Sequence, residues 1–123
     1  MEAIDTTLPN VAPISWAVRA GSTLYTVAVP IEKDGSFRLG DIATQSELAF
    51  ENLKMILAAA GGSLRDVVQV VVYLVDVADS KVINEQWKRY FSEPWPNRAI
   101  IGTSALTVKG MKVEMVVTAF LGL

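Results

Sequence analysis

The sequence contains neither cysteine nor histidine. These absences exclude disulfides, thiolate nucleophiles, zinc sites built on Cys or His ligands, and acid–base chemistry by an imidazole. Basic and acidic residues are nearly balanced, at 11 and 13, and no basic cluster occurs, so no overall field would attract nucleic acid or anionic lipid. Any chemistry must come from carboxylates, Arg, Lys, Tyr, Ser, Thr or backbone groups.

The sequence also lacks a long hydrophobic run. No segment approaches the roughly 20 consecutive apolar residues that span a bilayer. Residues 1–13 have neither the basic flank nor the apolar stretch of a secretory signal. These observations predict a soluble, cytoplasmic protein without a membrane partner.

The composition is that of a folded chain. Apolar residues make up 51% and charged residues 20%, whereas disordered chains are poor in apolar residues. A length of 123 residues fits one domain with its own core. We therefore expect a single domain over residues 1–123, in which residues 1–13, broken by Pro9 and Pro13, form an extended lead-in.

Two turns are expected early in the chain. The segment Ser15–Val29 is rich in β-branched and aromatic residues and is interrupted by Gly21-Ser22, which predicts two strands joined by a tight turn. Asp34-Gly35 marks a second turn, because Asp-Gly readily supplies the positive φ angles that tight turns need.

A helix is predicted over residues 42–60. Thr44-x-x-Glu47 matches a capping box, apolar residues then recur at helical spacing, and Gly61-Gly62 ends the pattern.

The segment Val67–Val75 is an almost unbroken β-branched run, which predicts a strand in the centre of the sheet and covered on both faces. A second helix ending before Pro94 is predicted from apolar residues at positions i, i+4, i+7 and i+8, and its aromatic stripe is expected to pack on the sheet. These residues are Ile83, Trp87, Tyr90 and Phe91.

Two strands are expected to close the chain, at Arg98–Leu106 and Met111–Leu121, around a turn at residues 108–110. The resulting order ββ, α, β, α, ββ predicts an α+β sandwich of two layers, with the helices on one face of a mixed sheet. Because many strand residues are apolar on both sides, we expect copies of the chain to pack sheet to sheet in a closed ring.

Arg98 is the first candidate site residue. It follows a loop stiffened by Pro94 and Pro96, so its guanidinium would be well placed to pair bidentately with a carboxylate. An arginine at the start of a strand can equally be a solvated or ion-paired surface group. Gly102 would leave room beside Arg98, or it would mark a bulge.

Glu114 is the second candidate, because it lies inside the closing strand among residues that favour burial. Alternation places it on the same face as Lys112 and Val116. One interpretation is an outward charge or a pair with Lys112. The other is a carboxylate held at a cleft, where it could orient water or move a proton.

The pattern around these two residues is distinctive. Segment 96–98, Pro-Asn-Arg, is followed by an apolar strand and then by segment 113–115, Val-Glu-Met. This arrangement resembles the C-terminal signature of the RidA/YjgF family, also called endoribonuclease L-PSP. The resemblance covers about residues 13 to 120. Further residues that match are Asn52, the strand end Tyr73–Asp76, Asn84 and the pair Tyr90-Phe91.

The resemblance implies a fold of the chorismate mutase type, with a mixed six-stranded sheet and two helices on one face. It implies a homotrimer with ligand clefts between subunits. It also implies hydrolysis of small carboxylate-bearing enamines and imines, such as 2-aminoacrylate, to 2-keto acids and ammonia, with no cofactor and no metal.

The resemblance further implies roles for individual residues. Arg98 would hold the substrate carboxylate, and Glu114 would position water as the catalytic residue. Backbone groups of Ile100 and of the Val27-Ala28 pair would help to fix the ligand. The substrate-binding set implied in this way is Arg98, Ile100, Ala28, Val27, Ile14 and Asn84.

The chain also departs from the family pattern. Deaminating members commonly have a Tyr near the start, a Ser-Gly on the second strand and a Cys two residues after the arginine, where this chain has Ile14, Val27-Ala28 and Ile100. The pocket is therefore expected to be drier and differently shaped, with a larger, more apolar substrate or reduced activity on 2-aminoacrylate. Trp16 would either supply the missing aromatic ring or be a packed strand residue.

Two alternatives to a general imine deaminase stay open. One is a pathway-specific deaminase of the aminomuconate type. The other is a non-catalytic regulatory trimer that binds a small carboxylate such as a keto acid. A ribonuclease activity finds little support, because histidine is absent and no basic or aromatic strip suited to a nucleic-acid partner occurs.

Overall fold

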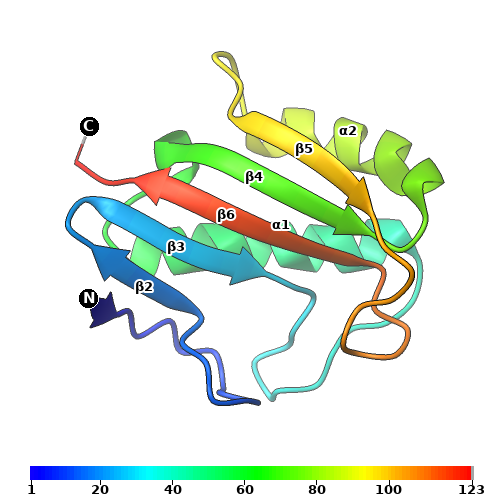
Figure 1. The fold of residues 1–123 in the computed structure, drawn as a ribbon, viewed down its shortest axis with the longest axis horizontal. Helices are drawn as coiled ribbons and strands as arrows, with labels where there is room; N and C mark the ends of the chain where they lie inside the picture. Colours follow the sequence, from blue (N-terminus) through cyan, green and yellow to red (C-terminus); the bar gives the residue numbers. More distant parts are fainter. Residues whose placement is uncertain (123) are drawn as a thin grey trace.

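The structure is a computed structural model that describes residues 1–122. One sheet carries two α-helices on one of its faces, as Figure 1 shows, so the predicted α+β arrangement with a mixed six-stranded sheet is confirmed. Two short 3-10 helices, η1 (Leu64–Asp66) and η2 (Val77–Asp79), flank the fourth strand. The main elements are β1 (Glu2–Ala3), β2 (Ala17–Ala20), β3 (Thr23–Ala28), α1 (Ile42–Ala59), β4 (Val67–Leu74), α2 (Ser80–Tyr90), β5 (Asn97–Gly102) and β6 (Val113–Phe120).

The strand order is β1-β2-β3-β6-β4-β5, and only the β4–β5 pair is parallel. The last two strands are therefore not neighbours, although a turn at residues 108–110 was expected between them. Strand β5 ends at Gly102 rather than at Leu106, because the next amide, that of Thr103, donates to the carbonyl of Leu74 at 2.9 Å and the chain then leaves the sheet.

The β-branched run forms β4, which is an interior strand but lies one place from the edge of the sheet rather than at its centre. Strand β4 is next to the edge strand β5, and the helices cover only one of its faces. Val70, Val72 and Leu74 are buried on that face, whereas Val68 is 42% exposed. A run of β-branched residues also suits a strand whose second face stays apolar without being covered by the same chain.

The hairpin and the Asp-Gly turn were predicted correctly. Strands β2 and β3 pair in antiparallel fashion around Gly21, which has a φ of 61°. Gly35 has a φ of 90°, and Asp34 accepts a hydrogen bond from the Ser36 amide at 2.9 Å. Within the lead-in, residues Glu2–Ala3 add β1 to the sheet edge.

The predicted first helix is α1, but Thr44 is not its N-cap. The Oδ1 atom of Asp41 accepts the Thr44 backbone N–H at 2.8 Å, which places the cap three residues earlier. Aspartate is a stronger cap than threonine, and its charge interacts favourably with the positive end of the helix dipole. The same hydrogen bond lowers the pKa of Asp41.

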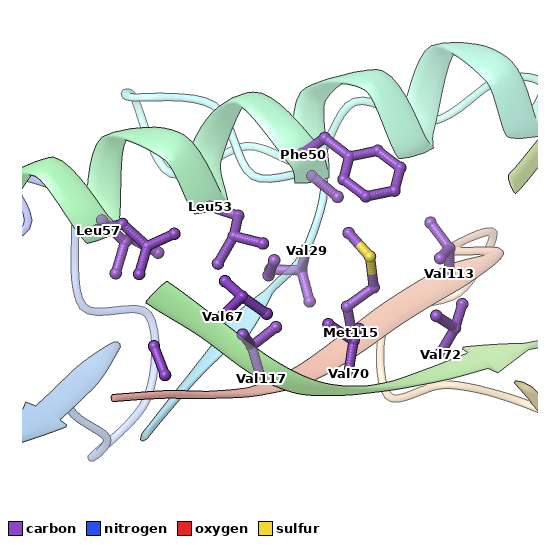
Figure 2. Packing of buried hydrophobic residues seen from close by; sticks show 14 of the residues in the cluster. Val29, Phe50, Leu53, Leu57, Val67, Val70, Val72, Val113, Met115 and Val117 are labelled. Carbon is purple, nitrogen blue, oxygen red and sulfur yellow. The ribbon is translucent and has the colours of Figure 1, made fainter. Parts of the chain in front are cut away.

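The core lies between the helices and the covered face of the sheet. Figure 2 shows Phe50, Leu53 and Leu57 of α1 directed toward side chains of β4 and β6, among them Met115 and Val117. The predicted aromatic stripe of α2 packs largely on α1, since the ring of Tyr90 stacks on Phe50 at 4.7 Å and the Trp87 ring meets Phe50 edge-on. These rings fix the position of α2 over β5.

We expect Leu53→Ala to lower the free energy of unfolding by about 2–5 kcal/mol, because it leaves a cavity at a position with no exposed surface. The control is Lys54→Ala, which removes an exposed side chain whose nearest carboxylate, on Glu51, is 4.0 Å away. That change should stay within about 0.5 kcal/mol. Urea denaturation measures both, and equal effects would contradict this account of the core.

Candidate functional site

Arg98 lies on β5 and directs its side chain toward α2. Its Nη2 atom donates to Oδ1 of Asn84 at 2.8 Å, and its Cζ atom lies 4.8 Å from the centre of the Trp87 ring. No carboxylate within residues 1–122 comes within ion-pair distance of Arg98. The guanidinium is thus a half-buried cation held by an amide and an aromatic face.

The helix explains this geometry. Asn84 and Trp87 are three residues apart on α2, so their side chains emerge on neighbouring positions of one helix face. The Trp87 indole is itself fixed by its packing against Phe50 and Phe91, at ring-centre distances of 6.3 and 4.3 Å. Burial lowers the pKa of Arg98, but an arginine side chain remains charged in the neutral pH range.

Arg98 lines a hollow of about 560 Å³ on the surface between α2 and the loop before β5. This volume falls within the range of small-molecule sites. No acidic side chain contributes to its wall. The lining residues are Asn84, Trp87, Lys88, Trp95, Pro96, Asn97 and Arg98.

Glu114 lies on β6, on the face of the sheet that the helices leave open. Its neighbours along the strand, Val113 and Met115, point into the core, so the pleat directs Glu114 the other way. It is half-buried, and it forms no ion pair with Lys112. Desolvation raises the pKa of Glu114.

The structure brings only some of the expected site residues together. Arg98, Ile100 and Asn84 form one group at the β5 edge, and Ile100 is half-buried on the helix side of the sheet. Glu114 is two strands away and on the opposite face.

A second group lies farther from Arg98, around β3. Val27 and Ala28 are on β3, three strands from β5, which corresponds to about 14 Å at the usual strand spacing. Ile14 precedes β2 and is 44% exposed. A single chain therefore does not assemble the whole set around Arg98.

The backbone of Val27 and Ala28 pairs with a neighbouring strand on one side only, although Ala28 is itself fully buried. The pairing of β2 with β3 ends at the Ala17–Thr26 pair, so the next two residues of β3 pair only with β6. Asn52 holds the chain that follows, because its Nδ2 atom donates to the carbonyls of Val29 and Ile31, both at 2.9 Å. Asn52 matched the family pattern, and the structure shows that its part is to fix this loop.

For Trp16 the structure supports the second of the two interpretations above, that of a packed residue. For Gly102 it shows a regular strand position in close contact with η2. Trp16 is 6% exposed and donates its indole N–H to the carbonyl of Pro9 at 2.9 Å, so it is a packed residue that anchors the lead-in. Gly102 pairs regularly with Leu74 and marks no bulge. A Cβ atom there would come 2.7 Å from the Cγ1 atom of Val77, so a larger residue would require the Val77 side chain in η2 to shift.

Trp87, Lys88 and Trp95 were not identified as site residues from the sequence. A signal was available for two of them, because Trp87 and Lys88 follow Asn84 at i+3 and i+4 and so share its helix face. Trp95 follows Pro94 directly, in the same loop that precedes Arg98.

Within residues 1–122, no helix is long and apolar enough to cross a membrane.

Comparison with known proteins gives a consistent result. A family model described as endoribonuclease L-PSP matches residues 5–121. The human protein named 2-iminobutanoate/2-iminopropanoate deaminase is 34% identical over 115 residues, which cover 91% of this chain and 82% of the human one. The crystal structure of RidA from Psychrobacter sp. PAMC 21119 matches with a TM-score of 0.90 and 37% identity, covering 98% of this chain and 100% of that chain. TdcF of E. coli with bound serine matches with a TM-score of 0.87 and 29% identity, covering 99% and 100%.

The raised pKa of Glu114 predicts that the contribution of this residue to stability depends on pH. A carboxyl group whose pKa is higher in the folded state favours folding most when it is protonated, so the contribution of Glu114 to stability grows as the pH falls. We expect Glu114→Gln to melt at a higher temperature than the wild type at pH 8. This difference in melting temperature should disappear at about pH 4. Thermal melts across this range measure the difference. Glu85→Gln, at an exposed position on α2, is the control, and an equal response there would contradict the assignment.

Proposed function

The chain belongs to the endoribonuclease L-PSP family, that of the RidA/YjgF proteins, and we propose that it is an enamine/imine deaminase. Its substrates are small imines that carry a carboxylate, and its products are 2-keto acids and ammonia. The observation that carries the proposal is the free positive charge of Arg98 in the hollow beside α2. A positioned guanidinium without a carboxylate partner of its own is suited to bind the carboxylate of a ligand.

The reaction needs little beyond binding and one proton-transfer group. Water adds to the imine carbon, the resulting carbinolamine loses ammonia, and a carbonyl group replaces the C=N bond. An enamine first gains a proton on carbon and becomes the imine. Orientation of the substrate by Arg98 and general acid–base help, typically worth about 10²–10⁴-fold, are enough for a substrate that already hydrolyses slowly in water.

Glu114 is the proposed acid–base group. Its carboxylate takes a proton from the attacking water and returns it to the departing nitrogen. Desolvation raises the pKa of Glu114, and a higher pKa makes a carboxylate a stronger base and brings it closer to the operating pH.

The active form in this proposal is a homotrimer. Within one chain, Arg98 and Glu114 lie on opposite faces of the sheet, so a joint action requires Arg98 of one subunit and Glu114 of the next. The open face of the sheet supports an interface between copies, because large apolar side chains remain exposed on three of its strands. These residues are Tyr25 at 51%, Ile101 at 44%, Val116 at 38% and Phe120 at 40%.

We expect Arg98→Ala to lower kcat/KM for 2-iminobutanoate by about 100-fold or more, with the lysine variant intermediate, because lysine keeps the charge and loses the bidentate geometry. The imine is generated in the assay from 2-aminobutyrate by an amino-acid oxidase, and its decay is followed as loss of trapped imine. The control is Arg65→Ala, at an exposed position in η1. Equal rates for wild type, Arg98→Ala and buffer would refute the proposed function.

The proposed trimer predicts that a charge on the open face of the sheet separates the subunits. Val116→Asp places a charge in the middle of the open face, so we expect a folded monomer by light scattering, with normal circular dichroism and no deaminase activity. Val11→Asp, which alters an exposed residue of the lead-in, should leave a trimer. A wild-type protein that is monomeric at micromolar concentration and still active would count against the shared site.

A further inference from the structure

The hollow around Arg98 contains a second positive charge. Lys88 lines it, is exposed, and has no ion-pair partner among the described residues. The wall has two cations and no carboxylate, although acidic residues outnumber basic ones in the chain as a whole. Such a concentration of charge of one sign attracts a ligand of the opposite sign, and a charge of −2 is attracted more than −1.

The two cations differ in how they are held. Arg98 is held by the hydrogen bond to Asn84 and by the ring of Trp87. Lys88 lies one helical turn beyond Asn84, which is about 6 Å along the axis of α2, and its side chain has a long flexible stem. An extended ligand with its first carboxylate on Arg98 would carry its other end toward Lys88.

Two indole rings contribute apolar surface to the wall of the hollow. Trp87 contributes a buried indole, and Trp95 contributes an indole that is 46% exposed. Pro96 stiffens the loop that presents Trp95. A longer chain of methylene carbons can bury more apolar surface against these rings than a three-carbon imine can.

We infer that this chain prefers imino acids with a second carboxylate at the far end of the carbon chain, and that Lys88 is the residue that selects them. The inference rests on the proposed function, since it takes the first carboxylate to be bound by Arg98. It adds the substrate class, which is a short-chain 2-imino dicarboxylate such as 2-iminoglutarate.

Binding of the corresponding keto acids tests the inference directly. We would measure 2-oxoglutarate and 2-oxobutyrate by isothermal titration calorimetry on the intact, assembled protein. The wild type should bind 2-oxoglutarate more tightly. Lys88→Ala should weaken 2-oxoglutarate by about three- to fivefold and change 2-oxobutyrate by less than about twofold, as expected for one partly exposed charge pair.

Reversing the charge of Lys88 gives a more discriminating test. Lys88→Glu should invert the preference, so that 2-oxobutyrate becomes the tighter ligand, and the advantage of 2-oxoglutarate in the wild type should shrink as salt is added. Lys81→Glu is the matched control, because it makes the same change of net charge on the same helix at an exposed residue outside the hollow. In turnover, the Lys88 variants should raise KM for the dicarboxylate imine and leave kcat nearly unchanged.

The outcomes separate the two proposals. If 2-oxobutyrate binds and Arg98→Ala abolishes that binding, but Lys88→Glu leaves the preference between the ligands unchanged, the inference on Lys88 is refuted and the proposed function stands. If neither keto acid depends on Arg98, the proposed function fails and this inference fails with it. An equal effect of Lys81→Glu would assign the preference to net charge and would also refute the part given to Lys88.

Discussion

The rest of the site depends on how Arg98 is held. Its partners are the amide oxygen of Asn84 and the face of Trp87, and both are neutral. A carboxylate in their place would fix the guanidinium equally well, but it would cancel the charge that a ligand must meet. Neutral partners set the position of the group in advance and leave its charge available, so less of the binding energy is lost in ordering the side chain.

The pleat of the sheet imposes a second constraint. Side chains alternate between faces along each strand, so Glu114 cannot reach the side of the sheet on which Arg98 lies without displacing Val113 and Met115 from the core. The chain cannot bring an acid–base group to Arg98 from β6 by any small adjustment. If both residues act in one reaction, the association of subunits is a requirement of the chemistry and not only a source of stability.

Much of the fold could be predicted from local patterns. The hairpin at Gly21, the helix from residue 42 and the Asp34-Gly35 turn each depend on residues close in sequence, and the structure confirms all three. The strand order could not be predicted, because β6 pairs with β3 and β4 over separations that leave no periodic signal. The cap at Asp41 was missed because Thr44 and Glu47 matched a known pattern so well.

The candidate site could be predicted from the sequence only in part. Arg98 and Glu114 could be singled out because each stands in an apolar strand, where a charge is conspicuous. The contacts that give Arg98 its position come from α2, and the side of the sheet on which each charge emerges depends on tertiary packing. Lys88 looked like any solvated lysine on a helix, and only its place in the hollow distinguishes it.

The position of β6 between β3 and β4 has a consequence for synthesis in the cell. Every other strand leaves the ribosome earlier, yet β3 and β4 share no hydrogen bonds and can be joined only through β6. Until residues 113–120 have been translated, the nascent chain holds two separate fragments, β1–β3 and β4–β5, each with unpaired strand edges and uncovered apolar surface. Completion of the sheet therefore waits for β6, and the chain is most exposed to chaperones and to aggregation in the interval before β6 pairs.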